Sequence, residues 1–352
     1  MNPSPAIASA PFATLLGLMR RHRALTLLAA LLVMLAGAAP QQFAVSLAFI
    51  GRSLLSLAPV LLLSVALAAS IRAAGAESLV ARAFVGRERR AVVVAALAGA
   101  LSPLCSCGVV PLIAGLLAGG VPLAPVMAFW LASPVMDPAM FVLTAGVIGT
   151  PFALAKTAAA IGLGLLGGWV TRLLWRQQAS ASALRGERWA GAPRGAQAWA
   201  AARTSFEPRF WRKAARRQQF AASFGDQLRL LLPLMAIAFL LESLMLAWLP
   251  PQAIGQWLGG EQFWAVPAAA LIGVPAYLNG TAAVPLAGAL IAQGLDPAVA
   301  MTFLVAGGVT SVPAAMAVWA LVRPKVFALY LALALVGSTA IGTVLALGGW
   351  LN

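Results

Sequence analysis

Apolar segments of about 20 residues or more recur along this 352-residue chain and constrain its fold more than any other feature. A helix of that length crosses roughly 30 Å of hydrocarbon. Only 9% of the residues are charged, whereas about 25% are charged in a typical soluble domain. The alternation of polar and apolar residues that is typical of membrane barrels is not visible. We therefore expect an all-α polytopic membrane protein.

Basic residues, which give the chain a net charge of +15, gather at the ends of apolar segments and between residues 172 and 229. Lys and Arg beside transmembrane helices mark the cytoplasmic side, and a polybasic segment can also rest on anionic lipid. We therefore expect the lipid bilayer, and no nucleic acid, as a partner. The N-terminus has a basic cluster before its first apolar run and lacks a signal-peptide cleavage site. It is interpreted as retained and cytoplasmic, in the cytoplasmic (inner) membrane of a prokaryote.

Glycine and proline positions recur across two halves of the chain. At an offset of 174, five of them coincide, namely Gly51, Pro59, Gly86, Gly99 and Pro111 with Gly225, Pro233, Gly260, Gly273 and Pro285. One inserted residue then changes the offset to 175, which aligns Pro122 with Pro297, Pro138 with Pro313 and Asp137 with Val312. We interpret this as an internal repeat. The predicted organisation is an N-terminal segment with one extra transmembrane helix (1–50), a first repeat (51–174), a basic cytoplasmic linker (175–224) and a second repeat (225–352).

The charges also predict how each half crosses the membrane. Single transmembrane helices are expected over about 24–39, 54–74, 122–146, 151–174, 227–249 and 297–322. If residues 91–119 also crossed once, the basic linker would lie outside, against the positive-inside rule. A re-entrant hairpin with legs of about 91–103 and 109–119, each half a membrane long, keeps the linker cytoplasmic.

The same reading of the second half places a hairpin over residues 265–292 that enters from the opposite side. The two repeats are then inverted, and their hairpin tips meet near the bilayer midplane. Inverted repeats with broken helices and a midplane site are typical of secondary transporters.

The first predicted tip contains the only two cysteines of the chain, Cys105 and Cys107, on either side of Ser106, and all three are candidate substrate-binding residues. Pro103 ends the first leg and Pro111 suits the first turn of the second, so the cysteines lie at a helix N-terminus, where thiolate is favoured. There they are candidate ligands for a soft metal or metalloid. Alternatively, they are packing residues, because free cysteine is commonly buried and inert. The facing tip offers Tyr277, Asn279, Gly280 and Thr281 to a substrate.

Three stretches carry a resemblance to a known family: LCSCGVVPL at 104–112, ASPVMDPAMF at 132–141 and GVPAYLNGTAAVPLAGAL at 273–290. They resemble the ArsP-like permeases, predicted membrane permeases that include efflux proteins for trivalent organoarsenicals. The resemblance extends over the chain outside residues 1–20 and the linker. It implies a permease whose site lies around the two tips and which exports methylarsenite-like compounds.

Ionisable residues within apolar segments are candidates for energy coupling. Asp137 lies in the middle of its predicted helix, and such a residue at membrane depth suggests proton coupling. Alternatively, Asp137 caps a helix at a proline break. Glu242, past the middle of its predicted helix, is the second candidate for proton coupling. Lys156 is predicted to snorkel to the interface.

These features predict a secondary active permease rather than an enzyme, with a small-molecule or metalloid substrate and a coupling proton as partners. No GxxxxGK[ST] motif is present, so the sequence gives no support for ATP hydrolysis. No cofactor is expected, since zinc sites usually take four ligands and the only histidine, His22, is far from the tip. Two alternatives stay open: a permease for an unrelated solute or metal ion with structural cysteines, and a membrane thiol-redox protein, although no CxxC motif is present. The sequence makes no prediction of oligomeric state.

Overall fold

The computed structural model describes residues 23–74, 88–102, 106–118, 121–175, 183–184, 209–248, 262–276 and 280–349, and these residues are helical without any strand. Five described helical segments are long and apolar enough to cross a bilayer. Large apolar side chains such as Leu63, Val142 and Leu347 are 71%, 72% and 84% exposed. So much exposed apolar surface suits contact with lipid rather than with water. The prediction of an all-α polytopic membrane protein is confirmed.

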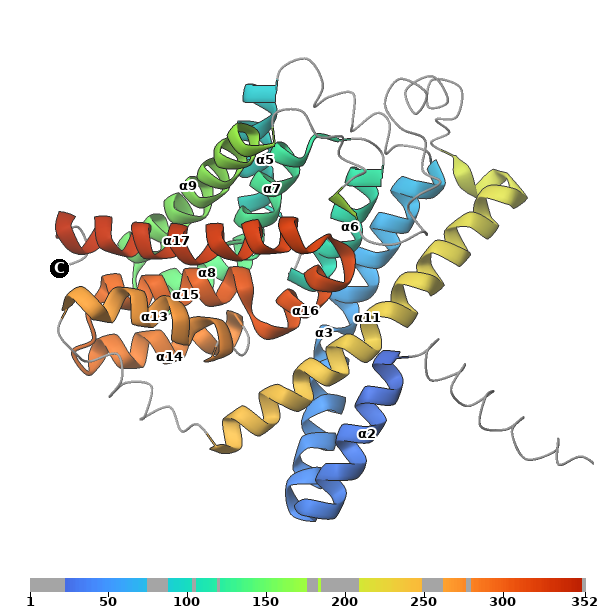
Figure 1. Cartoon of the computed structure of the whole chain (residues 1–352), viewed down its shortest axis with the longest axis horizontal. Coiled ribbons are helices and arrows are strands. Elements are labelled where there is room, and N and C mark those ends of the chain that lie inside the picture. The colour runs from blue at the N-terminus through green and yellow to red at the C-terminus, as the bar shows by residue number, and fades with distance from the viewer. Residues whose placement is uncertain are drawn as a thin grey trace, which may run out of the picture.

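The helices of the first half are α2 (Arg23–Ala38), α3 (Pro40–Ala74), α5 (Glu88–Ala100), α6 (Ser106–Ala118), α7 (Leu123–Ala132), α8 (Pro138–Val147) and α9 (Thr150–Leu174). The second half begins with a 3-10 turn, η3 (Phe210–Arg212). Its helices are α11 (Ala214–Trp248), α13 (Gln262–Ala276), α14 (Gly280–Ala292), α15 (Pro297–Thr310), α16 (Val312–Leu321) and α17 (Pro324–Gly348). In Figure 1, α2, α3 and α11 form a three-helix group beside a larger bundle. Helices α6 and α16 lie where the bundle meets α3 and α11.

Two of the predicted transmembrane helices are interrupted. The segment 122–146 consists of α7 and α8, separated by residues 133–137, and the segment 297–322 consists of α15 and α16 on either side of Ser311. Pro138 and Pro313 explain the breaks, because each lies in the first turn of the second piece, where a missing amide removes no helical hydrogen bond. The prediction of one continuous helix in each place is therefore wrong.

The four helices in the predicted hairpins are too short to cross the membrane. Helices α5, α6 and α14 have 13 residues each and α13 has 15, which corresponds to roughly 20 Å at 1.5 Å per residue. They lie where the sequence predicts half-membrane legs, within three residues of the expected bounds of α5 and α6. Their entry from one side as re-entrant hairpins stays a prediction.

Equivalent helices of the two halves begin 174 residues apart, as in the pairs Pro40 and Ala214, Glu88 and Gln262, Ser106 and Gly280, Leu123 and Pro297, Pro138 and Val312, and Thr150 and Pro324. The starting residues of the helices therefore show no one-residue insertion between the two halves. The prolines themselves are displaced, because Pro138 is the first residue of α8 and Pro313 the second of α16, and both positions tolerate proline. Asp137 therefore corresponds to Ser311 and not to Val312. The predicted boundaries at residues 50 and 224 fall inside α3 and α11, since both helices begin earlier than expected.

Close helix contacts recur at equivalent glycines. An ideal Cβ on Gly99 would lie 2.8 Å from the carbonyl oxygen of Phe129, and one on Gly273 would lie 2.8 Å from that of Phe303. Gly273 lies 174 positions after Gly99, and Phe303 lies 174 positions after Phe129. The packing of α5 on α7 is thus repeated in the packing of α13 on α15.

Contacts between the halves are reciprocal. Helix α6 packs on α16, and its equivalent α14 packs on α8, which is the equivalent of α16. Helices α9 and α17 cross at Leu163 and Gly337, which are themselves equivalent positions. Contact between equivalent positions is what a two-fold relation between two similar units produces. The inversion of the two halves across the membrane stays a prediction.

Candidate functional site

The first predicted tip lies before α6. This helix begins at Ser106, and Cys107 is its second residue. Cys105 lies outside the described residues, as do the side-chain positions of Ser106 and Cys107. Cys107 is thus in the first helical turn, where backbone amides have no partner within the helix and the helix dipole favours negative charge.

The second predicted tip lies before α14, which begins at Gly280 and continues with Thr281. Tyr277 and Asn279 lie outside the described residues, and so does the side-chain position of Thr281. A helix N-terminus is therefore present at this position too. The meeting of the two tips at the bilayer midplane stays a prediction.

Asp137 lies at the break between α7 and α8. Its Oδ1 accepts a hydrogen bond of 2.8 Å from the backbone nitrogen of Met140, and its backbone is extended, as is usual for an N-cap. The capping role that the sequence offered as an alternative is present. Proton coupling through Asp137 stays a prediction.

Lys156 differs from its prediction. The side chain is 0% exposed and does not snorkel, because α9 packs against α5, α7, α8, α15 and α17. Its Nζ has no hydrogen-bond partner within the described part of the chain. The sequence prediction did not include Lys156 in the site, although an ionisable residue in a membrane helix is itself a signal of function.

Glu242 lies in α11, in the three-helix group. Its Oε2 is buried and has no hydrogen-bond partner among the described residues. The neighbouring Ser243 Oγ lies 2.9 Å from Ser46 Oγ, and the Gln42 amide donates to Ser46 Oγ over 3.3 Å. Glu242 therefore lies next to a polar cluster between α3 and α11, whereas Asp137 and Lys156 belong to the larger bundle.

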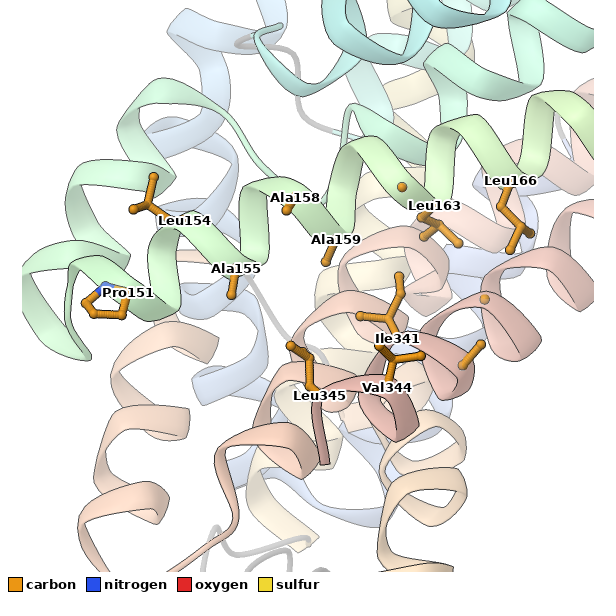
Figure 2. Close-up of a pocket in the computed structure, with 13 residues that line it drawn as sticks. Pro151, Leu154, Ala155, Ala158, Ala159, Leu163, Leu166, Ile341, Val344 and Leu345 are labelled. Carbon is orange, nitrogen blue, oxygen red and sulfur yellow. The ribbon is translucent and has the colours of Figure 1, made fainter. Parts of the chain in front are cut away.

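A groove of about 630 Å³ lies between α9 and α17 (Figure 2). Its lining includes Leu154, Leu166, Ile341 and Leu345, with small residues such as Ala158 between them. Asp137 and Glu242, the predicted site residues whose side chains the structure describes, do not line this groove. The chemistry of its described lining suits a hydrocarbon chain.

Comparison with known proteins connects these features to one family. The family model ArsP_1, described as "Predicted permease", matches residues 42–347, from the beginning of α3 to the end of α17. The UPF0718 protein YcgR of Bacillus subtilis (strain 168) is 39% identical over 80 residues. This stretch is 23% of the present chain and only 27% of the curated relative. No solved structure matches the chain.

Proposed function

The chain belongs to the ArsP_1 family of predicted permeases, so it is a multi-pass membrane protein of the transporter class, and we propose that it exports a small thiophilic solute by secondary active transport. The observation that carries this proposal is the position of the only two cysteines, Cys105 and Cys107, directly before and within the first turn of α6. A pair of thiols at a helix N-terminus suits a soft, thiol-reactive cargo.

Trivalent organoarsenicals such as methylarsenite are the cargo that fits this pair best. Soft trivalent arsenic prefers thiolate ligands. A monomethyl species has two exchangeable positions, whereas arsenite has three. The two cysteines complete the shell of methylarsenite and leave arsenite one ligand short. Because an exporter has to release its cargo, we expect the thiols to exchange transiently, with Tyr277, Asn279, Gly280 and Thr281 lining the opposite side of the site.

The experiment is a resistance and transport comparison in a host that lacks its own arsenical exporters. Cells that express the protein should survive methylarsenite better than arsenite, and everted membrane vesicles should accumulate methylarsenite. Cys105→Ser, Cys107→Ser and the double variant should reduce both readouts to the level of cells without the protein, because serine removes the soft ligand with little change in volume. Thr343→Ala in α17, where the hydroxyl is exposed and bonds only within its own helix, is the control and should remain active.

The opposite result has a clear meaning. Full methylarsenite resistance in the double serine variant, at normal expression, would make the cysteines packing residues. The binding role would then move to Tyr277, Asn279, Thr281 and the surrounding backbone.

A proton gradient is the proposed energy source, with Asp137 and Glu242 as the candidate proton carriers. The proposed location is the cytoplasmic (inner) membrane, with the N-terminus in the cytoplasm and the halves inverted across the bilayer. The reciprocal contacts of α6 with α16 and of α14 with α8 support such a two-fold relation. An uncoupler should therefore abolish methylarsenite accumulation in everted vesicles.

A further inference from the structure

Five basic residues gather where the second half of the protein begins. They lie in and beside η3 and in the first turn of α11, namely Arg209, Arg212, Lys213, Arg216 and Arg217. No acidic residue lies between Glu207 and Asp226, so all five charges of this basic cluster are positive. Arg216 is half-buried and the other four side chains are exposed. The cluster therefore presents a concentrated positive charge to its surroundings.

The position of the cluster is unfavourable for the helix itself. The N-terminus of a helix carries a partial positive charge, so cations in its first turn are repelled by the helix dipole. Like charges spaced by four residues, as in Lys213 and Arg217, also repel each other. Helix stability alone would favour acidic or neutral residues here. An anion outside the helix explains the basic cluster better than its local structure does.

The equivalent segment of the first half contains no charge at these positions. The five basic residues correspond, 174 positions earlier, to Leu35, Ala38, Ala39, Gln42 and Phe43. The two halves also share the contact made by this segment. The Gln42 amide lies 3.5 Å from the carbonyl oxygen of Ser243 in α11, and Arg216 Nη1 donates over 2.8 Å to that of Ala73 in α3. Because a neutral side chain makes the contact in one half, the fold does not require the positive charges of the other.

The basic cluster is held against the three-helix group. Arg216 joins the start of α11 to the end of α3, and these two helix ends lie side by side in Figure 1. The turn η3 packs on both α3 and α11. Arg209 and Arg212 therefore keep their places beside Arg217, so the charges form a preorganised surface.

The depth of the basic cluster is that of lipid headgroups. Residues Ala214–Leu244 form a candidate membrane span of 31 residues. At 1.5 Å per residue this segment is about 46 Å long, which corresponds to a bilayer with its headgroup layers, about 40–45 Å, rather than to the hydrocarbon core of about 30 Å. The first turn of α11 thus lies among the headgroups, with η3 directly beside it.

An exposed tryptophan marks the same level. Trp211 is the middle residue of η3 and is 55% exposed. Tryptophan is enriched where a membrane meets water, because its ring is apolar and its N–H is polar. An exposed tryptophan between basic residues at the end of a membrane span favours contact with lipid headgroups over contact with a soluble anion.

We propose that the basic cluster binds the headgroups of anionic phospholipids. The guanidinium groups of Arg209, Arg212 and Arg217 suit the phosphate oxygens, because each can donate two parallel hydrogen bonds. A zwitterionic phospholipid has a phosphate too, but its own ammonium group offsets the charge. The surface should therefore select lipids with a net negative charge. This site is independent of the proposed cargo and of its coupling to a gradient.

The test is a comparison of lipid retention by the purified full-length protein. The protein in detergent is titrated with phosphatidylglycerol or phosphatidylcholine, and the lipid molecules that stay bound are counted by native mass spectrometry. The wild type should retain phosphatidylglycerol preferentially. Replacement of Arg209, Arg212, Lys213 and Arg217 by glutamine should abolish this preference, and each single replacement should weaken phosphatidylglycerol retention about fivefold. Arg216 is left unchanged because it bonds to Ala73.

Two further variants separate the site from general effects of charge and folding. Replacement of Arg89, Arg90, Arg323 and Lys325 by glutamine removes the same number of exposed positive charges elsewhere and should preserve the preference. Replacement of Arg209, Arg212 and Arg217 by lysine keeps the charge of the cluster and should also preserve it. An equal loss of preference in the matched control would overturn the site, because net charge alone would then explain retention.

Two other outcomes would also contradict the proposal. Unchanged preference for phosphatidylglycerol in the four-glutamine variant would mean that the basic cluster is only a signal for membrane orientation. Displacement of bound phosphatidylglycerol by a short DNA duplex at physiological ionic strength would instead assign the surface to nucleic acid.

Discussion

At the scale of single residues, two aspartates have the same local role in different surroundings. Asp137 caps α8 through Met140, and Asp296 caps α15 through the backbone nitrogen of Ala298 at 2.7 Å. Asp137 lies at the break between α7 and α8, and both of these helices pack on α9, which contains the buried Lys156. The two caps can thus be compared in different surroundings.

Substitution by asparagine separates the two roles. Asparagine caps a helix as well as aspartate does, so Asp296→Asn should leave the melting temperature of the purified protein near the wild-type value, whereas Asp296→Ala should cost about 1 kcal/mol. Asp137→Asn should melt clearly lower at neutral pH despite its intact cap, because it removes a negative charge from the break beside the helix that contains the buried Lys156. Equal responses of the two asparagine variants would mean that Asp137 is only a cap.

At the scale of elements, small residues allow short and broken helices to pack closely. Helix α5 approaches α7 at Gly99, and α13 approaches α15 at Gly273, in both cases against a backbone carbonyl that cannot move without its helix. The helical glycines Gly51 and Gly225 have nothing within 4 Å of an ideal Cβ. Glycine therefore has a packing role at the first two positions that is absent at the second two.

Alanine substitutions should reveal this difference. Gly99→Ala and Gly273→Ala place a Cβ 2.8 Å from a carbonyl oxygen and should each destabilise the protein by about 1–3 kcal/mol, since overpacking forces a backbone shift. Gly51→Ala and Gly225→Ala should be neutral or slightly stabilising, because alanine is the better helix former. Thermal unfolding of the four purified variants measures the contrast. Similar melting temperatures for all four would show that the close contacts are not limiting.

At the scale of the whole molecule, a described piece of the basic linker contacts the junction of α16 and α17. The carbonyl oxygen of Ala183 accepts a hydrogen bond of 2.9 Å from the backbone nitrogen of Arg323, and Leu184 forms a single bridge with Val322. Residues 183–184 and the start of α17 therefore lie next to each other, and we expect both on one side of the membrane. This agrees with the positive-inside rule if that side is the cytoplasm.

Reporter fusions test the resulting topology. A reporter inserted at about residue 200, in the linker, should report a cytoplasmic position, and one at the C-terminus, after the single crossing of α17, should report the opposite side. A fusion directly before α17 should agree with the linker and serves as the control. Linker and C-terminal reporters on the same side would rule out the inverted arrangement.

The membrane class and the short helices α5, α6, α13 and α14 follow from the sequence alone, because they depend on local properties. The length of an apolar run decides whether a helix spans the bilayer, and recurring glycine and proline positions indicate the internal repeat. The sequence also allowed the prediction that Asp137 caps a helix, because an N-cap residue and the proline that follows it are neighbours in the chain.

Only the tertiary structure decided that the two apolar segments around Asp137 and Ser311 are broken, because a proline within an apolar run is compatible with either a kink or a new helix. It also decided that Lys156 is enclosed. Whether a lysine near a helix end reaches the interface depends on which helices surround it, and those helices come from distant parts of the chain. The position of the buried Lys156 relative to the break between α7 and α8, and its neutral counterpart Tyr330, which bonds to Val309, therefore became visible only when α7, α8 and α9 could be compared with α15, α16 and α17 in space.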